Sequence, residues 1–208
     1  MAHRLSSSKT ESLNPFPALT DLMANAFMIL SLFLFFALLQ ASDLNRRLKS
    51  ATPIIIDEKS KNFKFGSGSA ELTPTLVKYI EQEIIPDIQE TLKQKKGNID
   101  FIQVIGHTDG QENRRLSNLD QKLEDVAQGK QPVTILSPGS NADLGLMRAL
   151  SVIEAINKSG KFPNIDFKAY SAGQLYDVSG RLAPADRSAD KSRRRMEIRF
   201  IPPGEAAK

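Results

Sequence analysis

A single carboxylate, Asp21, lies inside the most apolar stretch of the chain. Residues 18–39 read ALTDLMANAFMILSLFLFFALL, and Asp21 is the only charged side chain among them. At ~1.5 Å per residue, a helix of this length spans roughly the ~30 Å hydrocarbon core of a bilayer. An ionised side chain there costs about 2.5–3.5 kcal/mol, so it usually faces a partner protein, a cavity or an ion path. The sequence therefore predicts that Asp21 carries protons.

Two plainer interpretations of this segment stay open. In a plain membrane anchor that starts at Ala18, Asp21 lies only ~4.5 Å along the helix axis and reaches headgroup water without a further role. In a secretory signal peptide, Arg4 and Lys9 would be the basic residues before the apolar run. The run is long for a signal peptide, and Leu39-Gln40-Ala41 is a poor cleavage site. These features favour an uncleaved span over residues 18–40.

A second group of polar residues follows an apolar run, residues 99–105, that is typical of a buried strand. His107 and Asp109, two residues apart, could share a strand face and act as catalytic base and orienter. The sequence places no serine or cysteine nucleophile beside them, His3 is the only other histidine, and cysteine is absent. The same shortage of ligands argues against a metal site. We expect no enzymatic activity and no cofactor.

The basic residues gather in two clusters, residues 46–49 and 191–195, and the net charge of the chain is +4. The second cluster, KSRRR, falls in an alternating strand pattern without an aromatic platform, which argues against binding to nucleic acid. In that alternation Arg194 shares the apolar face, so we expect a structural role with a buried carboxylate or carbonyl partner. Arg193 and Arg195 point the other way, toward solvent or an acidic glycan or phosphate.

Periodicity indicates the elements that position these residues. Strands are expected over residues 54–57, 63–65, 99–105, 165–170 and 195–200. One helix should begin at Pro74 with Thr73 as its N-cap, break near Pro86 and end at Gly97. A second helix fits Leu144–Asn157, with Gly160 as its terminator. The expected fold is α+β, with the order β-α-β-α-β-β, a mixed sheet and two main helices behind a single N-terminal transmembrane helix.

These motifs, taken in order, resemble those of OmpA-like peptidoglycan-binding domains. The family series GHTD, NxxLSxxRA and RRxEI corresponds to residues 106–109, 141–149 and 194–198, and residues 65–72 fit the segment upstream. The resemblance covers roughly residues 54–201. Separately, Leu19-Thr20-Asp21-Leu22-Met23 followed by apolar residues resembles the single helix of MotB-like stator proteins, whose aspartate carries protons. Together the two resemblances are those of a MotB-type subunit.

The resemblance implies a domain order and a location. It places a cytoplasmic tail at residues 1–17, the transmembrane helix at 18–40, a linker at 41–53 and a periplasmic OmpA-like domain at 54–208, with an insertion at 110–140. The chain is then a single-pass protein of the bacterial inner membrane with a cytoplasmic N-terminus. The count of basic residues does not settle this orientation, because Lys and Arg flank both ends of the span.

The resemblance also implies a ligand site. In the family an aspartate and an arginine hold the zwitterionic end of diaminopimelate in the peptidoglycan stem peptide, and these positions correspond to Asp109 and Arg148. A carboxylate suits the ammonium group, and a guanidinium takes the carboxylate in a bidentate pair. Thr108, Asn141 and Leu144 complete the expected site. From the residues alone, a turn-capping Asp109 and a surface ion pair at Arg148 are the alternatives, and both side chains are expected to be exposed without ligand.

A MotB-type subunit would be the peptidoglycan-anchored half of a proton-driven motor. Its partner would be a MotA-like multi-span protein, and a homodimer is expected. A static inner-membrane tether without an ion path is the alternative. The sequence does not choose between a flagellar motor, another energised envelope machine and a Zorya-type anti-phage defence system. It does not decide between protons and sodium, and it does not give the partner stoichiometry.

Two features depart from the family pattern. Gly145 stands where the family usually has serine, which is expected to remove one hydrogen bond of about 1 kcal/mol near the ligand. The insertion at 110–140 carries its own helical signal, with Ser117 and Asp120 as a capping pair and Gly129 as terminator. A segment of this length is either a surface excursion or a cap that reshapes the site.

Overall fold

The computed structural model describes residues 16–50, 53–57, 64–95 and 99–203. The chain divides into an N-terminal unit that ends at Leu48 and a globular unit that begins at Lys49. Residues 1–15 of the expected cytoplasmic tail and the expected helix terminator Gly97 lie outside the described residues.

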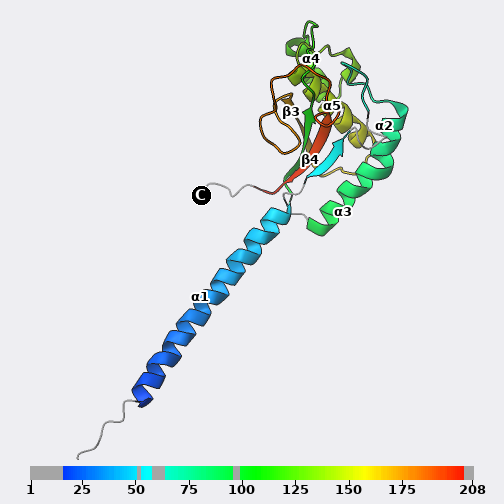
Figure 1. Cartoon of the computed structure of the whole chain (residues 1–208). Helices are drawn as coiled ribbons and strands as arrows, with labels where there is room; N and C mark the ends of the chain where they lie inside the picture. Colours follow the sequence, from blue (N-terminus) through cyan, green and yellow to red (C-terminus); the bar gives the residue numbers. More distant parts are fainter. Residues whose placement is uncertain (1–15, 51–52, 58–63, 96–98, 204–208) are drawn as a thin grey trace, which may run out of the picture. The chain divides into compact units, whose positions relative to one another are not determined.

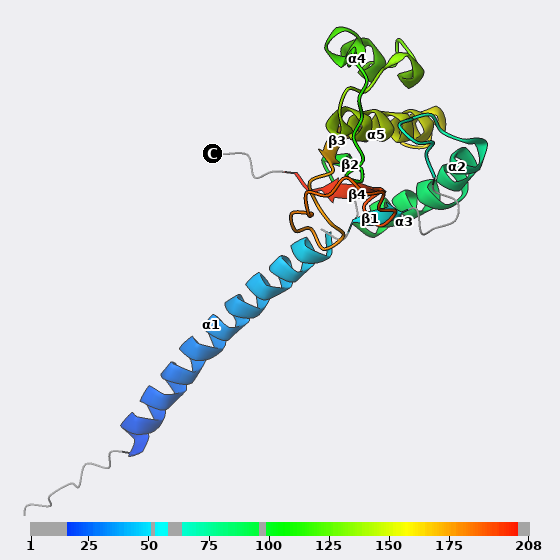
Figure 2. The same cartoon turned by 45° about the horizontal axis from the view of Figure 1, so that its top comes forward.

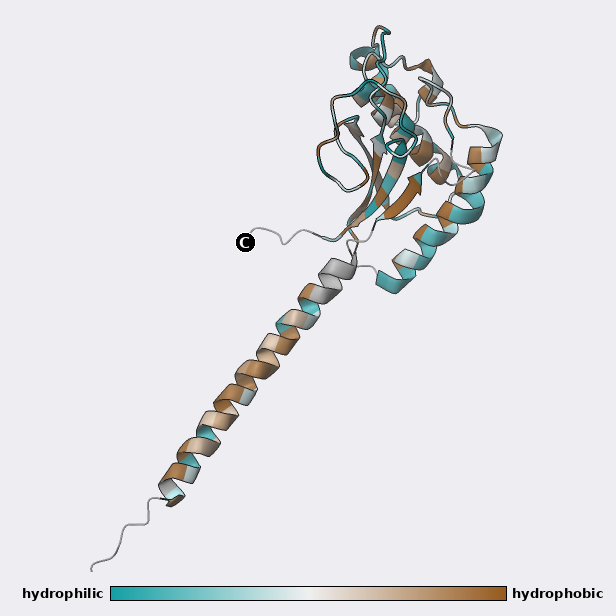
Figure 3. Ribbon diagram, viewed as in Figure 1, coloured by the Kyte–Doolittle hydropathy of each residue, from teal (hydrophilic) through white to brown (hydrophobic). Residues whose placement is uncertain are grey.

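The described part of the N-terminal unit lies in one continuous helix, α1 (Phe16–Ser50), drawn in blue in Figure 1. Among the described residues, Leu19–Leu44 is the one helical stretch long and apolar enough to cross a membrane, and most of its ribbon has the brown colour of hydrophobic residues in Figure 3. Asp21 lies in the first turn of this stretch. The expected linker is helical as far as Ser50, so the span and the residues after it form a single helix.

The globular unit is built on a four-stranded mixed sheet with the order β1-β4-β2-β3. Strands β2 and β3 are parallel, and β4 is antiparallel to both β1 and β2. The expected α+β class and mixed sheet are confirmed. The predicted strand at 63–65 is wrong for Lys64 and Phe65, which lie outside any strand. The four strands are β1 (Ile54–Asp57), β2 (Phe101–His107), β3 (Asp166–Gly173) and β4 (Arg195–Ile201).

The first helical segment of the globular unit is distorted as the sequence predicts. The Thr73 hydroxyl accepts a hydrogen bond from the backbone N–H of Leu76 at 3.2 Å and caps the helix. Pro86 offers no N–H, and just before it the backbone N–H of Ile85 reaches back five residues to the carbonyl of Ile80. The segment therefore consists of α2 (Pro74–Tyr79), a π-helical turn (Ile80–Ile84) and α3 (Ile85–Lys95).

Helix α5 (Asn141–Lys158) begins three residues earlier than predicted. Ser140 and Asp143 form a reciprocal capping box, with the Asp143 backbone N–H donating to the Ser140 hydroxyl at 3.1 Å. The helix ends before Gly160, whose φ of 66° allows the left-handed turn. This early start makes Asn141, a predicted ligand residue, the first residue of the helix.

The two faces of the sheet have different roles. One face, represented by Ile102, Val104 and Ile198, is apolar and packs in a single core with α5 and the α2–α3 segment (Figure 2). Each fully buried aliphatic side chain contributes about 1.5–3 kcal/mol. The opposite face of β4 carries Arg195, Glu197 and Arg199. The alternation of charged and apolar residues in the sequence therefore places them on opposite faces of the strand, as predicted.

The insertion forms a helical unit of its own. It holds α4 (Leu119–Ala127) and a short 3-10 turn (Val133–Ile135), and α4 lies beyond α5 on the side away from the sheet (Figure 2). The predicted capping pair is wrong, because Asn118 is the N-cap. Its amide donates to the Ile135 carbonyl at 3.0 Å and accepts from Ser137 at 2.7 Å, which closes the insertion on itself. The insertion packs on α5 through a second apolar cluster, Ala70, Leu119, Val126, Val133, Leu136 and Met147.

Helix α5 approaches β2 through two glycines. A Cβ on Gly106 would lie 2.0 Å from the carbonyl oxygen of Gly145, and a Cβ on Gly145 would lie 2.3 Å from the Ser171 hydroxyl. Backbone therefore meets backbone at this point, and no side chain fits at Gly106. The contact fixes the start of α5 against the end of β2.

We predict that Gly106→Ala lowers the free energy of unfolding by about 1–3 kcal/mol or more, because the helix must move off the strand. The matched control is Gly66→Ala, whose new Cβ would meet its nearest neighbour, Ser69 Cβ, at an ordinary 3.4 Å. Urea unfolding of the full chain in detergent, followed by circular dichroism, measures both. Equal stability of the two variants would contradict the close approach.

Candidate ligand-binding site

A cavity of about 290 Å³ opens where β2 ends, β4 begins and α5 starts. Two of its residues follow β2, three come from the first turns of α5, and two, Ala189 and Arg194, come from the segment before β4. Its walls are completed by residues 64–68 and by residues 111–113 at the start of the insertion. The cavity brings together all five predicted peptidoglycan-binding residues and the predicted structural arginine: Thr108, Asp109, Asn141, Leu144, Arg148 and Arg194.

The Asp109 carboxylate is bonded to three different chain segments. Its carboxylate pairs with the Arg194 guanidinium and accepts backbone N–H bonds from Gln111 and Asp190, each at 3.3 Å. Only 5% of Asp109 is exposed, so the expectation of an exposed carboxylate is wrong. Arg194 has the buried carboxylate partner that its strand face predicted. That partner is the predicted ligand residue itself.

Arg148 is also buried, against the expectation of an exposed side chain or a surface ion pair. Its Nε donates to the Ser69 carbonyl at 2.9 Å and its Nη2 to the Gly66 carbonyl at 3.2 Å. The guanidinium carbon lies 4.9 Å from the centre of the Phe65 ring. Arg148 thus holds the loop that forms one wall of the cavity. These loop contacts are a physical reason why Phe65 is not in a strand.

The remaining predicted residues supply neutral groups. The Asn141 amide donates to the Gln111 carbonyl at 2.8 Å and to the Asp109 carbonyl at 3.3 Å, which fixes the turn after β2. Leu144 forms a buried apolar wall. The Thr108 backbone N–H donates to Gly173, whereas its buried hydroxyl has no hydrogen-bond partner. The cavity therefore combines two carboxylates, Asp109 and Glu112, with two arginines and an unpartnered hydroxyl.

Gly145 does not line this cavity. Its position against β2 and beside the Ser171 hydroxyl shows that the glycine serves the packing of α5 on the sheet. The expected loss of a ligand hydrogen bond at this position is therefore wrong.

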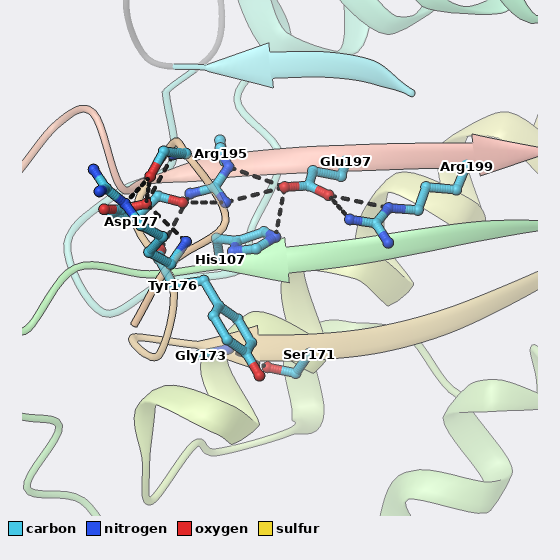
Figure 4. A network of polar contacts seen from close by, with 10 residues as sticks. His107, Ser171, Gly173, Tyr176, Asp177, Arg195, Glu197 and Arg199 are labelled. Atoms are coloured by element: carbon cyan, nitrogen blue, oxygen red, sulfur yellow. Dashed lines mark hydrogen bonds and ion pairs between the residues drawn. The ribbon is translucent and has the colours of Figure 1, made fainter. Parts of the chain in front are cut away.

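A second polar network surrounds Glu197 on the sheet face away from the helices (Figure 4). Arg195 donates to one carboxylate oxygen at 3.0 Å and Arg199 to the other at 2.6 Å. His107 Nε2 lies 3.1 Å from the first of these oxygens. His107 thus contacts Glu197, whereas Asp109 contacts Arg194, so the two do not form the base-and-orienter pair considered from the sequence.

Arg193 and Arg195 are each only 4% exposed, so their predicted exposure to solvent is wrong. Arg195 donates to the Asp177 carbonyl at 3.0 Å, and Arg193 donates to the Gln174 carbonyl. Both carbonyls belong to the segment between β3 and β4, which folds back over these side chains. The strand pattern could not reveal this cover, because it comes from residues almost twenty positions away.

The Glu197 carboxyl is held in its charged form. The hydrogen bond with His107 and then the bond from Arg199 lower the pKa of Glu197 from 4.5 to about 2, against the opposing effect of burial. The carboxylate is thus a fixed negative charge between three cationic or polar partners, and it joins β2 to β4.

Comparison with known proteins gives likenesses of fold. No protein-family model matches the chain, and no curated protein matches it by sequence. Among solved structures, it is similar to a periplasmic domain of MotB, with 19% identity and a TM-score of 0.47 over 74% of this chain and 65% of that one. The Helicobacter pylori MotB periplasmic domain matches at 20% identity with a TM-score of 0.46, over 75% of this chain and 86% of that one. The Burkholderia pseudomallei peptidoglycan-associated lipoprotein matches at 19% identity with a TM-score of 0.39, over 70% of this chain and 88% of that one.

The match thus spans less than two thirds of the first of these MotB domains. The likeness concerns the α+β fold, and the argument for function rests on the residues of the site.

We predict that Glu197→Gln reduces the dependence of the free energy of unfolding on pH at acidic pH. Because the folded-state pKa of Glu197 is depressed, its contribution is complete above pH 4.5 and is lost as the pH falls toward about 2. The variant should lose about 3 kcal/mol at pH 7 and show a smaller further loss between pH 4.5 and 2. Urea midpoints across this range measure the effect. Glu154→Gln, which removes an exposed pair with Lys158, should leave the profile unchanged, and an unaltered slope in Glu197→Gln would contradict the assignment.

Proposed function

We propose that this chain is the peptidoglycan-anchored subunit of a proton-driven motor complex in the bacterial inner membrane, similar in role to a MotB-type stator subunit. In this proposal the N-terminus is cytoplasmic and the globular unit is periplasmic. The ligand is the diaminopimelate-containing stem peptide of peptidoglycan.

The cavity is the observation that carries the proposal. A carboxylate and a guanidinium in one cavity can hold the two charges of a zwitterionic ligand, and Asp109 and Arg148 both line this one. Each carboxylate oxygen accepts more than one hydrogen bond, so a ligand ammonium can join Arg194 on Asp109. The first turn of α5 adds partial positive charge on the side of Asn141, which favours a ligand carboxylate. Thr108 and Leu144 complete the polar and apolar parts of the site.

The motor half of the proposal rests on Asp21. Its carboxyl lies on a helix whose neighbouring residues are apolar, and such a group is costly unless it faces a partner or an ion path. A MotA-like multi-span protein would supply that path. Protonation and release at Asp21 would change the relative stability of two partner positions and so bias their motion. A homodimer anchored to the cell wall would keep this subunit from turning with its partner.

A static tether to peptidoglycan is the second candidate, and the same cavity favours it. It differs from the motor only in lacking ion flux through Asp21. Within the motor class, flagellar, other envelope and Zorya-type anti-phage machines are compatible with these residues. The neighbouring genes would separate them, because a MotA-like gene favours the motor and defence genes beside it favour the last.

We predict that Asp109→Asn and Arg148→Gln each weaken binding of the full chain in detergent to isolated peptidoglycan by about tenfold or more, because each removes one charge of the site. Their combined effect should fall short of the sum, since both hold one ligand group. Both variants should also lower the unfolding midpoint, because the wild-type side chains are buried and bonded. Binding is therefore compared per folded molecule.

The matched control for these variants is Glu112→Gln. Glu112 also lines the cavity, but its carboxylate pairs with Arg114 at 3.0 Å and with Arg187 at 3.5 Å. This variant should bind almost as the wild type does. If folded Asp109→Asn and Arg148→Gln proteins bind peptidoglycan normally, the cavity is not the anchor site.

We predict that Asp21→Asn abolishes proton influx into cells that also express the multi-span partner, because asparagine keeps the shape and removes the titration. Membrane insertion and peptidoglycan binding should be unchanged. Asp43→Asn, near the other end of the same apolar stretch, serves as the control and should retain the flux. Normal flux in Asp21→Asn, or none in the wild-type pair, would leave the static tether.

A further inference from the structure

Besides His107 Nε2, which lies 3.1 Å from a Glu197 oxygen, four buried side-chain atoms in the described part of the chain lack a hydrogen-bond partner. Two are His107 Nδ1 and the Nε of Arg193, whose Nη2 donates to Gln174. The other two are the Thr108 hydroxyl and the Asn113 amide nitrogen. Both of these residues line the same cavity. A buried polar group without a partner is uncommon, and a ligand that supplies the partner explains it.

Asn113 comes from the insertion, and none of the motifs that define the cavity includes it. Its surroundings are nevertheless fixed. The preceding Gln111 accepts a bond from Asn141 at 2.8 Å and donates to Asp109 at 3.3 Å. Glu112 pairs with Arg114 and with Arg187. The insertion therefore enters the cavity wall as an ordered segment, and Asn113 is held there by the contacts of its neighbours.

The chemistry of the two unpartnered groups defines what they would bind. An amide nitrogen is a donor only, and the Thr108 hydroxyl can donate as well. The complementary ligand group is an oxygen acceptor. Lys64 and Arg148 add positive charge to the lining, whereas the carboxylates of Asp109 and Glu112 already pair with arginines. This balance favours a carboxylate over a neutral carbonyl.

We propose that Asn113 is a ligand-contacting residue that sets specificity by donating its amide N–H, together with the Thr108 hydroxyl, to a carboxylate oxygen of the stem peptide. The inference rests on the proposed peptidoglycan-binding function and adds to it a contact from the insertion. The insertion is then part of the binding site, and a chain without it would hold the same ligand less tightly.

The experiment uses the full chain in detergent and titrates it with the soluble tripeptide L-alanyl-γ-D-glutamyl-diaminopimelate by calorimetry. Asn113→Ala should weaken binding about tenfold, the value expected for one lost hydrogen bond to a charged group. Its unfolding midpoint should not fall, because the wild-type amide makes no bond within the protein. Asn113→Asp should bind more weakly than Asn113→Ala at pH 7, because a second carboxylate repels the first.

Asn118→Ala is the matched control, since Asn118 is an asparagine of the same insertion whose amide is fully bonded within the protein. It should lower the unfolding midpoint and leave the Kd of the folded protein unchanged. The tripeptide amidated at its carboxylates should bind weakly to the wild type and lose little further affinity in Asn113→Ala.

The outcomes separate the inference from the function on which it rests. If the wild type and Asn118→Ala bind the tripeptide and Asn113→Ala binds it equally well, the role of Asn113 is wrong and the proposed function stands. If Asn113→Ala loses affinity only in proportion to a loss of stability, Asn113 is a structural residue and the inference is again wrong. If the wild type binds neither the tripeptide nor isolated peptidoglycan, both the inference and the proposed function fail.

Discussion

The ion pair between Asp109 and Arg194 is the interaction on which the cavity depends. It joins the turn after β2 to the start of β4 across 85 positions of sequence. The same carboxylate accepts backbone bonds from Gln111, at the start of the insertion, and from Asp190, at the end of the segment between β3 and β4. One buried charge therefore organises three chain segments, and the partner that makes its burial tolerable is an arginine of the same cavity.

A second constraint comes from the packing of α5 on the sheet. Because Gly106 and Gly145 allow backbone to approach backbone, the first turn of α5 lies against the end of β2. The Asn141 amide and the Arg148 guanidinium then reach the cavity from one helix. Arg148 also orders the loop at Gly66 and Ser69, so the residue proposed to hold the ligand builds the wall around it as well. Binding and folding are thus coupled at the same side chains.

The consecutive arginines 193–195 illustrate how the context decides what a charge does. Arg193 donates a hydrogen bond to the Gln174 carbonyl, and Arg194 pairs with Asp109. Arg195 donates to Glu197 and to the Asp177 carbonyl. In the sequence this run resembles a basic patch exposed to solvent. In the structure, Arg193 and Arg195 instead form hydrogen bonds that hold the segment between β3 and β4. Little of its charge remains for a nucleic acid or a glycan, and the favourable charge for a ligand is concentrated in the cavity.

The sequence by itself determined the features that depend on neighbouring residues. The apolar span with Asp21, the Thr73 cap, the distortion before Pro86 and the alternation of β4 all follow from local periodicity and backbone chemistry. The motifs also indicated which residues would meet, because their order matched a known arrangement of elements, and the cavity does contain them.

Only the tertiary structure decided what those residues contact. Burial of Asp109 and Arg148, the packing role of Gly145, the part played by Asn118 in closing the insertion, and the place of Asn113 in the cavity wall all depend on segments distant in sequence. The physical reason is that periodicity gives the direction of a side chain from its own strand or helix. Whether water, a backbone carbonyl or an opposite charge lies in that direction is settled by the long-range packing of the other elements.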